Sequence, residues 1–142
     1  KVKNQKNFPK KIYIDRSDSK SNISHLRSIE NETEVREYLK KQGFEPVRLS
    51  DLSFTDQVNL FNKVEVVTGL HGSGFANIIF CKSGTRVIEF RNSSSGPIIG
   101  NIAEKNSLNY SPIIVQTKNI DFGLQQGHIN ISIQELSKLL KD

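Results

Sequence analysis

A glycine-spaced turn between an apolar strand and a short helical segment carries the residues best suited to chemistry. The turn covers residues 69–74, and His71 and Ser73 lie between its three glycines. The first N–H groups of a helix have no acceptor within the helix, and the helix dipole favours negative charge there. The pattern therefore predicts a site for a phosphate or a carboxylate. A histidine in such a turn can donate to the anion or act as an acid or a base.

Three consecutive residues, Gly72, Ser73 and Gly74, are expected to contact the anion. Ser73 is interpreted as a phosphate-contacting hydroxyl or a helix cap, because the flanking residues lack the glycine spacing of a nucleophile elbow. A serine hydrolase using Ser73 and His71 is disfavoured, since side chains two residues apart on one tight turn could hardly form the required hydrogen bond. The turn also lacks the lysine of a Walker loop and the spacing of a dinucleotide-binding loop.

Two arginines, Arg16 and Arg27, emerge on a loop that we expect to lie near this turn. One guanidinium binds phosphate through two parallel hydrogen bonds, and two guanidinium groups suit a diphosphate. A surface ion pair is the simpler interpretation for either arginine alone. Glu89, near the end of an apolar strand, is expected at the ligand edge of the sheet, where acidic side chains accept ribose hydroxyls. A solvated strand-end acid is the alternative.

Strand-like and helix-like segments alternate along most of the chain. Capping boxes, in which a polar N-cap residue precedes an acid by three positions, mark helix starts at Asn31, Ser53 and Ser132, and Gly43 marks a helix end. The expected strands cover residues 11–14, 46–49, 64–68, 85–90 and 112–116. The expected helices cover residues 32–42, 54–61, 75–80, 98–104 and 133–140.

This alternation predicts an α/β fold: a Rossmann-like, three-layer α/β/α domain with a five-stranded, mostly parallel sheet. Ligands of such sheets bind beyond the carboxyl ends of strands, where the strand order reverses. The polar loops after Ile14 and after Thr68 both follow carboxyl ends. For these loops to meet, the first and third strands must be neighbours, which gives the order 2-1-3-4-5.

Composition and charge limit the possible functions. The chain has 142 residues and a net charge of +5, and five lysines lie within its first eleven residues. We therefore expect a basic, flexible tail over residues 1–10 and one domain over residues 11–142. Nucleic acid is not an expected partner, because aromatic residues are not interleaved with basic ones as on a base-stacking surface. A single cysteine, Cys81, excludes an internal disulfide and offers no metal-ligand spacing.

The ends of the chain bear on its completeness. No apolar run approaches the roughly 18 residues that a membrane helix needs, and no secretory signal is present. The chain starts at Lys1 and contains no methionine. We therefore expect a fragment whose partner domain could hold half of an active site.

Several spaced motifs together resemble one family. They are Arg27-x-x-x-Asn31-Glu32, Gly43-Phe44, Leu52-Ser53-Phe54-x-x-Gln57-Val58-x-Leu60-Phe61, the run from Gly69 to Phe80, and Gly84-Thr85-x-Val87-Ile88-Glu89. This set resembles the carboxyl-terminal part of glycosyltransferase family 61, which includes bacterial capsular-polysaccharide proteins and eukaryotic O-GlcNAc and xylosyl transferases. The family's usual turn is His-Gly-Ala-Gly-Leu-x-Asn, and here Ser73 and Phe75 replace the alanine and the leucine.

The resemblance implies the nucleotide-sugar-binding half, here carboxyl-terminal, of a GT-B enzyme that inverts the anomeric configuration without a metal. Arg27 and the turn at His71–Gly74 would then hold the diphosphate of a UDP-linked sugar, and Glu89 the ribose or base. Arg16 fits the diphosphate role by location, and His71 is the expected catalytic residue. No cofactor is implied.

The same resemblance implies a glycan or protein acceptor bound with a missing amino-terminal domain. It implies a cytoplasmic location in bacteria, with membrane association, or the secretory lumen in eukaryotes. We expect the isolated chain to bind nucleotide weakly and to transfer nothing. The alternative is a non-catalytic, flavodoxin-like binding or regulatory module with Asp15 as a receiver-type carboxylate.

Overall fold

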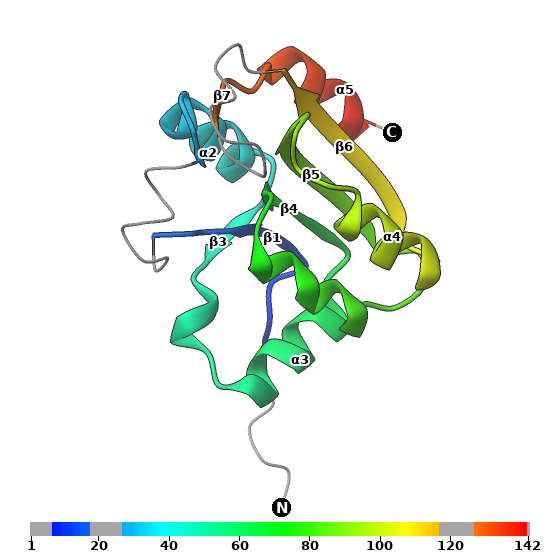
Figure 1. The fold of residues 1–142 in the computed structure, drawn as a ribbon. Helices are drawn as coiled ribbons and strands as arrows, with labels where there is room; N and C mark the ends of the chain where they lie inside the picture. Colours follow the sequence, from blue (N-terminus) through cyan, green and yellow to red (C-terminus); the bar gives the residue numbers. More distant parts are fainter. Residues whose placement is uncertain (1–6, 18–26, 117–126, 142) are drawn as a thin grey trace, which may run out of the picture.

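A five-stranded parallel sheet forms the centre of the molecule (Figure 1). The computed structural model describes residues 7–17, 27–116 and 127–141. The strands lie in the order β3-β1-β4-β5-β6, and every pair is parallel. Their bounds are β1 Lys11–Ile14, β3 Glu45–Val47, β4 Val66–Leu70, β5 Arg86–Asn92 and β6 Asn109–Val115. This order is the predicted 2-1-3-4-5, so the α/β, Rossmann-like prediction is confirmed.

Helical segments cover both faces of the sheet and make three layers (Figure 1). On one face lie α3 (Phe54–Lys63), α4 (Ile98–Lys105) and a 3-10 run, η2 (Ser73–Phe80). On the other face lie α2 (Glu32–Lys41) and α5 (Ile133–Lys141). Alternate residues of β5 follow this division: Val87 packs in the first core, and Ile88 and Phe90 pack in the second.

A second, smaller sheet joins segments that are far apart in the sequence. Strand β2 (Arg27–Ile29) pairs in parallel with β7 (Gly127–Ile129), and Ile29 lies opposite Ile129. Both isoleucines are buried in the core under α2 and α5. These two strands were not predicted from the sequence. Each has only three residues, too few to show an alternating pattern.

The predicted caps at Ser53 and Ser132 are confirmed. The Ser53 hydroxyl accepts a hydrogen bond from the Asp56 N–H at 3.1 Å, and Ser132 accepts from the Glu135 N–H at 3.2 Å. Gly43 follows α2 with a φ of +88°, a conformation that favours glycine at the end of a helix.

The N-cap position predicted for Asn31 is confirmed, but the capping-box hydrogen bond to the helix backbone is absent. Its amide donates to the Ile131 carbonyl at 2.7 Å and accepts from the Ile131 N–H at 2.9 Å. The side chain therefore ties the start of α2 to the segment after β7, a tertiary partner that outcompetes the local cap.

A short 3-10 stretch, η1 (Leu49–Asp51), lies between β3 and α3. The η2 run, predicted as a helix over residues 75–80, is also 3-10 and begins two residues earlier, at Ser73.

Candidate functional site

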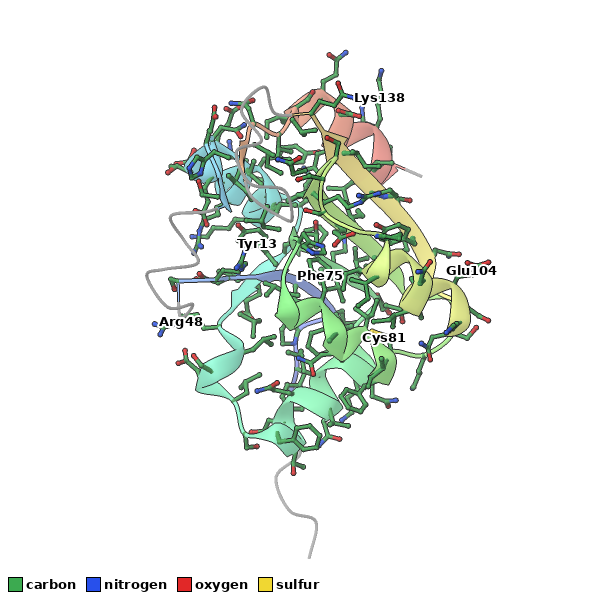
Figure 2. The ribbon with its side chains drawn as sticks, in the orientation of Figure 1. Tyr13, Arg48, Phe75, Cys81, Glu104 and Lys138 are labelled. Atoms are coloured by element: carbon green, nitrogen blue, oxygen red, sulfur yellow. The ribbon has the colours of Figure 1, made fainter. Side chains whose placement is uncertain are left out.

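An open cleft of about 410 Å³ lies where the order of the strands reverses. From β1 the chain passes outward to β3 and then crosses back to β4, so β1 and β4 border the switch point. The cleft is lined by the carboxyl ends of these two strands, by β2 and by the first turns of α2. The lining residues used below are Tyr13, Asp15, Arg16, Glu32, Arg36 and Leu70. Tyr13 is labelled in Figure 2.

Both signs of charge meet in this cleft. Arg36 lies 3.3 Å from the Asp15 carboxylate and 3.7 Å from Glu32, and the Ser17 N–H donates to Asp15 at 2.9 Å. Burial alone would raise the pKa of Asp15, but the hydrogen bonds from Ser17 and the charge of Arg36 outweigh it and lower that pKa. Burial, together with the nearby Glu32, raises the pKa of Tyr13, whose hydroxyl donates to Glu32 at 3.2 Å. Asp15 is thus held in its ionised form.

Arg16 connects the cleft to the glycine turn. Its Nη1 donates to the His71 carbonyl at 3.2 Å. Its guanidinium lies against Gly72 so closely that a Cβ there would come within 3.2 Å of the Arg16 Cζ. The lack of a side chain at Gly72 is therefore what lets a positive charge lie on the turn.

The other two glycines allow the turn to pack against β1. Gly69 has a φ of +153°, and a Cβ there would lie 3.3 Å from both the Cβ and the carbonyl oxygen of Ile14. A Cβ on Gly74 would lie 3.4 Å from Cγ2 of Ile14 and 3.1 Å from Cδ1 of Leu49 in η1. Close approach of the backbone thus places the start of η2 beside the end of β1, as the convergence of the two polar loops predicted.

A buried histidine–carboxylate pair lies behind the turn. The His71 Nδ1 is 2.5 Å from one oxygen of Glu89, and the side chains are 4% and 0% exposed. The other Glu89 oxygen accepts a hydrogen bond from the Tyr110 hydroxyl at 2.5 Å. Burial, and then this bond to Glu89, raises the pKa of Tyr110, which keeps the phenol protonated. Both carboxylate oxygens are therefore engaged inside the protein.

Arg91 adds a positive charge to the same group. Its Nε lies 3.9 Å from the Glu89 oxygen that Tyr110 contacts, and its Nη1 donates to the Ser95 carbonyl. Within the described ranges, Arg91 Nε is the only buried side-chain nitrogen or oxygen without a hydrogen-bond partner. The guanidinium thus offsets part of the cost of burying the Glu89 carboxylate.

The sequence model of the family described as glycosyltransferase 61 matches residues 1–88, more than half of the chain. The chain belongs to glycosyltransferase family 61. No curated protein matches it. The matched range contains β1 to β4, the cleft and the glycine turn, and it ends one residue before Glu89.

The structure of this family 61 domain brings together Arg16, His71 and the glycine turn, and it places Glu89 directly behind His71. Arg27 lies in β2 and Ser73 begins η2, but the side chains of both lie outside what the structure describes. The roles predicted for these residues in diphosphate binding stay predictions.

The location predicted for Glu89 needs correction. We expected its carboxylate at the open edge of the sheet, ready for a ribose or a base, or else solvated. It is instead fully buried, and both of its oxygens have partners. The physical reason is that β5 is an inner strand and that η2 and α4 cover this face of the sheet. The end of such a strand is not necessarily open to solvent.

Three residues of these two regions were missed by the sequence analysis. From the sequence, Arg36 would be interpreted as a surface charge on a helix. In the structure it forms an ion pair with Asp15. Tyr110 lies opposite Val87 in the β5–β6 register, so it shares a face with Glu89 and Arg91. The signal that could have indicated Tyr110 and Arg91 is the alternation of β5 and β6, once the register was known.

No group of three histidine, cysteine, aspartate or glutamate side chains in the described ranges is arranged to hold a metal ion. None of the helices in the same ranges is both long and apolar enough to span a bilayer. Cys81 is buried, and burial raises the pKa of its thiol to about 12.

Proposed function

We propose that the cleft and the glycine turn bind the diphosphate of a nucleotide-linked sugar, with UDP as the favoured nucleotide. The chain would then be the donor-binding part of an inverting glycosyltransferase that needs no metal ion. The observation that carries this proposal is Arg16, which lies on Gly72 and contacts the His71 carbonyl at the switch point of the sheet. Membership of glycosyltransferase family 61 supports the reaction class.

The geometry suits the leaving group of such a reaction. In an inverting transfer, the acceptor oxygen attacks C1 of the sugar, and the bond from C1 to the diphosphate oxygen breaks. Negative charge then grows on the departing nucleoside diphosphate. Arg16 and the N–H groups at the start of η2 are the described groups that would stabilise that charge in place of a metal.

The remaining parts of the reaction belong to the proposed partner domain. A GT-B enzyme closes two Rossmann-like domains around its substrates, so the acceptor, a glycan or a protein, would be held across the cleft. The base that takes the proton of the acceptor hydroxyl would come from that side. In a bacterium we propose that this synthesis takes place at the cytoplasmic face of the membrane.

The alternative of a receiver-type module rests on Asp15. In the structure, Asp15 is paired with Arg36 at the wall of the cleft, and Glu32 is the second carboxylate near that arginine. A salt-bridged carboxylate next to the diphosphate site fits a wall of the donor pocket. Phosphorylation of Asp15 by acetyl phosphate, detected by mass spectrometry, would favour the receiver instead.

Calorimetric titration with UDP, GDP and CMP tests the proposal. We expect saturable binding of one nucleotide, and a loss of about 10- to 100-fold in affinity in Arg16→Ala. Arg48→Ala is the matched control, because Arg48 is exposed, forms an ion pair with Asp51 and does not line the cleft. Equal affinity in Arg16→Ala and in the control would contradict the proposed site. If none of the three nucleotides binds to this chain or to the full-length protein, the proposed function is contradicted.

A further inference from the structure

Glu89 joins two side chains that no single motif connects. His71 comes from the turn after β4, and Tyr110 comes from β6, across β5. Each contacts a different oxygen of the same carboxylate at 2.5 Å. Because Glu89 is 0% exposed, water does not compete for these contacts. The carboxylate is thus held at two points, and it holds the ring of His71 at one.

The contact to His71 selects between the two nitrogens of the ring. A carboxylate only accepts hydrogen bonds, so the proton in this contact lies on the Nδ1 of His71. Which ring nitrogen is protonated is set by the hydrogen bond that the other one makes. With Nδ1 fixed in this way, Nε2 is the nitrogen through which His71 can meet a ligand.

Tyr110 reaches Glu89 because α4 has no side chain at Gly100. A Cβ at that position would lie 2.9 Å from Cε2 of the tyrosine ring, closer than such contacts are found. Glycine in the middle of a helix is unfavourable by roughly 1 kcal/mol relative to alanine. The position of the Tyr110 ring therefore explains why glycine stands at position 100 although it destabilises the helix.

We propose that Tyr110 and Glu89 are positioning residues that fix the Nδ1–H tautomer of His71, so that Nε2 accepts a hydrogen bond from a hydroxyl group of the ligand at the glycine turn. The identity of that ligand as a nucleoside diphosphate rests on the proposed function. The assignment of the tautomer does not rest on the proposed function. Neither Tyr110 nor Glu89 touches the ligand in this arrangement, because both oxygens of Glu89 and the hydroxyl of Tyr110 are used within the protein.

Long-range ¹H–¹⁵N correlation spectra of the histidine rings test the tautomer directly. The chain is labelled with ¹⁵N at histidine and studied at a pH at which the imidazole ring is neutral. We then expect His71 to show a protonated Nδ1 and an unprotonated Nε2. The His71→Asn spectrum assigns its signals. Glu89→Leu removes both acceptor oxygens, so we expect the single tautomer to be lost. A protonated Nε2 in the neutral wild-type ring, or an unchanged tautomer in Glu89→Leu, would overturn the proposal.

Tyr110→Phe removes only the hydroxyl and keeps the ring. We expect it to weaken UDP binding by about tenfold, which corresponds to the loss of one hydrogen bond between the ligand and Nε2 of His71. Gly100→Ala, which would push the ring away from Glu89, should act in the same direction although alanine favours the helix. Tyr38→Phe is the matched control, because Tyr38 lies on α2 and packs against the opposite core.

The outcomes separate the two proposals. If Tyr110→Phe and Tyr38→Phe bind UDP with equal affinity and leave His71 in the same tautomer, the role of Tyr110 is refuted while the proposed function stands. If wild-type His71 shows the Nδ1–H tautomer but neither the chain nor the full-length protein binds any nucleotide, the proposed function fails and the tautomer assignment stands. Retention of the Nδ1–H tautomer in Glu89→Asp, but not in Glu89→Leu, would further support the carboxylate as the group responsible.

Discussion

The cleft and the buried group behind the glycine turn hold similar charges in opposite environments. In the cleft, the Asp15 and Arg36 side chains are 12% and 37% exposed, and their closest atoms are 3.3 Å apart. Behind the turn, Glu89 and His71 are 0% and 4% exposed and 2.5 Å apart. Exposed pairs contribute little and can exchange partners, whereas a buried pair cannot lose one member without a large cost. The cleft is therefore suited to binding and releasing a ligand, whereas the buried group is suited to holding side chains in a fixed geometry.

The largest effect is expected from removing the carboxylate of the buried group. Glu89→Ala leaves His71, Tyr110 and Arg91 without their shared partner and should lower the free energy of unfolding by roughly 3–5 kcal/mol. Urea denaturation followed by circular dichroism measures the change. Glu37→Ala, at an exposed position of α2, is the control and should stay within about 0.5 kcal/mol of wild type. Similar losses in the two variants would remove the contrast between the regions.

Arg16 should show the reverse pattern. Arg16→Ala is expected to lose about 1.5–3 kcal/mol of nucleotide binding free energy. Its free energy of unfolding should change by less than about 1 kcal/mol, because its hydrogen bond to the His71 carbonyl is only partly buried. Titration calorimetry and urea denaturation of the same preparation give both numbers. A large loss of stability with unchanged binding would mean that Arg16 belongs with the buried group rather than with the cleft.

Asn31 tests how the wall of the cleft is held. Asn31→Ala removes both hydrogen bonds to Ile131 and should cost about 1–2 kcal/mol. Hydrogen exchange should accelerate at the amides of residues 129–131 and at the start of α2. Asn62→Ala, which removes one exposed bond to the Phe80 carbonyl, is the matched control. Unchanged exchange in Asn31→Ala would show that packing of the isoleucines alone holds this wall.

The smallest effect concerns Asp15 and depends on pH. The pKa of Asp15 is lowered in the folded chain, so its contribution to stability is present above the unfolded-state value, about 4, and is lost as the pH falls through the folded-state value. Asp15→Asn should therefore be less stable than wild type by under about 1 kcal/mol at neutral pH, because Arg36 is more than a third exposed. Thermal unfolding at neutral and strongly acidic pH should show the difference vanish in acid. A difference that grows in acid would contradict this sign.

Much of the fold could be predicted because its signals are local. Apolar runs separated by capping boxes gave the main strands and helices, and convergence of two polar loops gave the strand order. The position of the cleft was predicted, because the end of β1 and the turn after β4 had to meet. The wall formed by β2 was not predicted, because β2 and β7 are each three residues long and pair across a hundred positions of sequence.

The buried group was beyond sequence reasoning for a different reason. His71 and Glu89 were each singled out, but a strand end looks the same in sequence whether a helix covers it or not. Only the register of β5 against β6 brings Tyr110 to the face of Glu89. The same limit applies to Asn31, where a local capping pattern is compatible with a distant partner that then prevails.

The pairing of β2 with β7 has a consequence for the order of folding during synthesis. The strands of the large sheet up to β6 can associate once residue 115 has left the ribosome, but β2 must wait until residues 127–129 follow. Contacts between segments so far apart form late, because a long loop has to close first. One wall of the cleft is therefore completed after the sheet that supports it. During that interval Ile29 lacks its pairing partner Ile129, and chaperones that recognise exposed apolar segments would find it there.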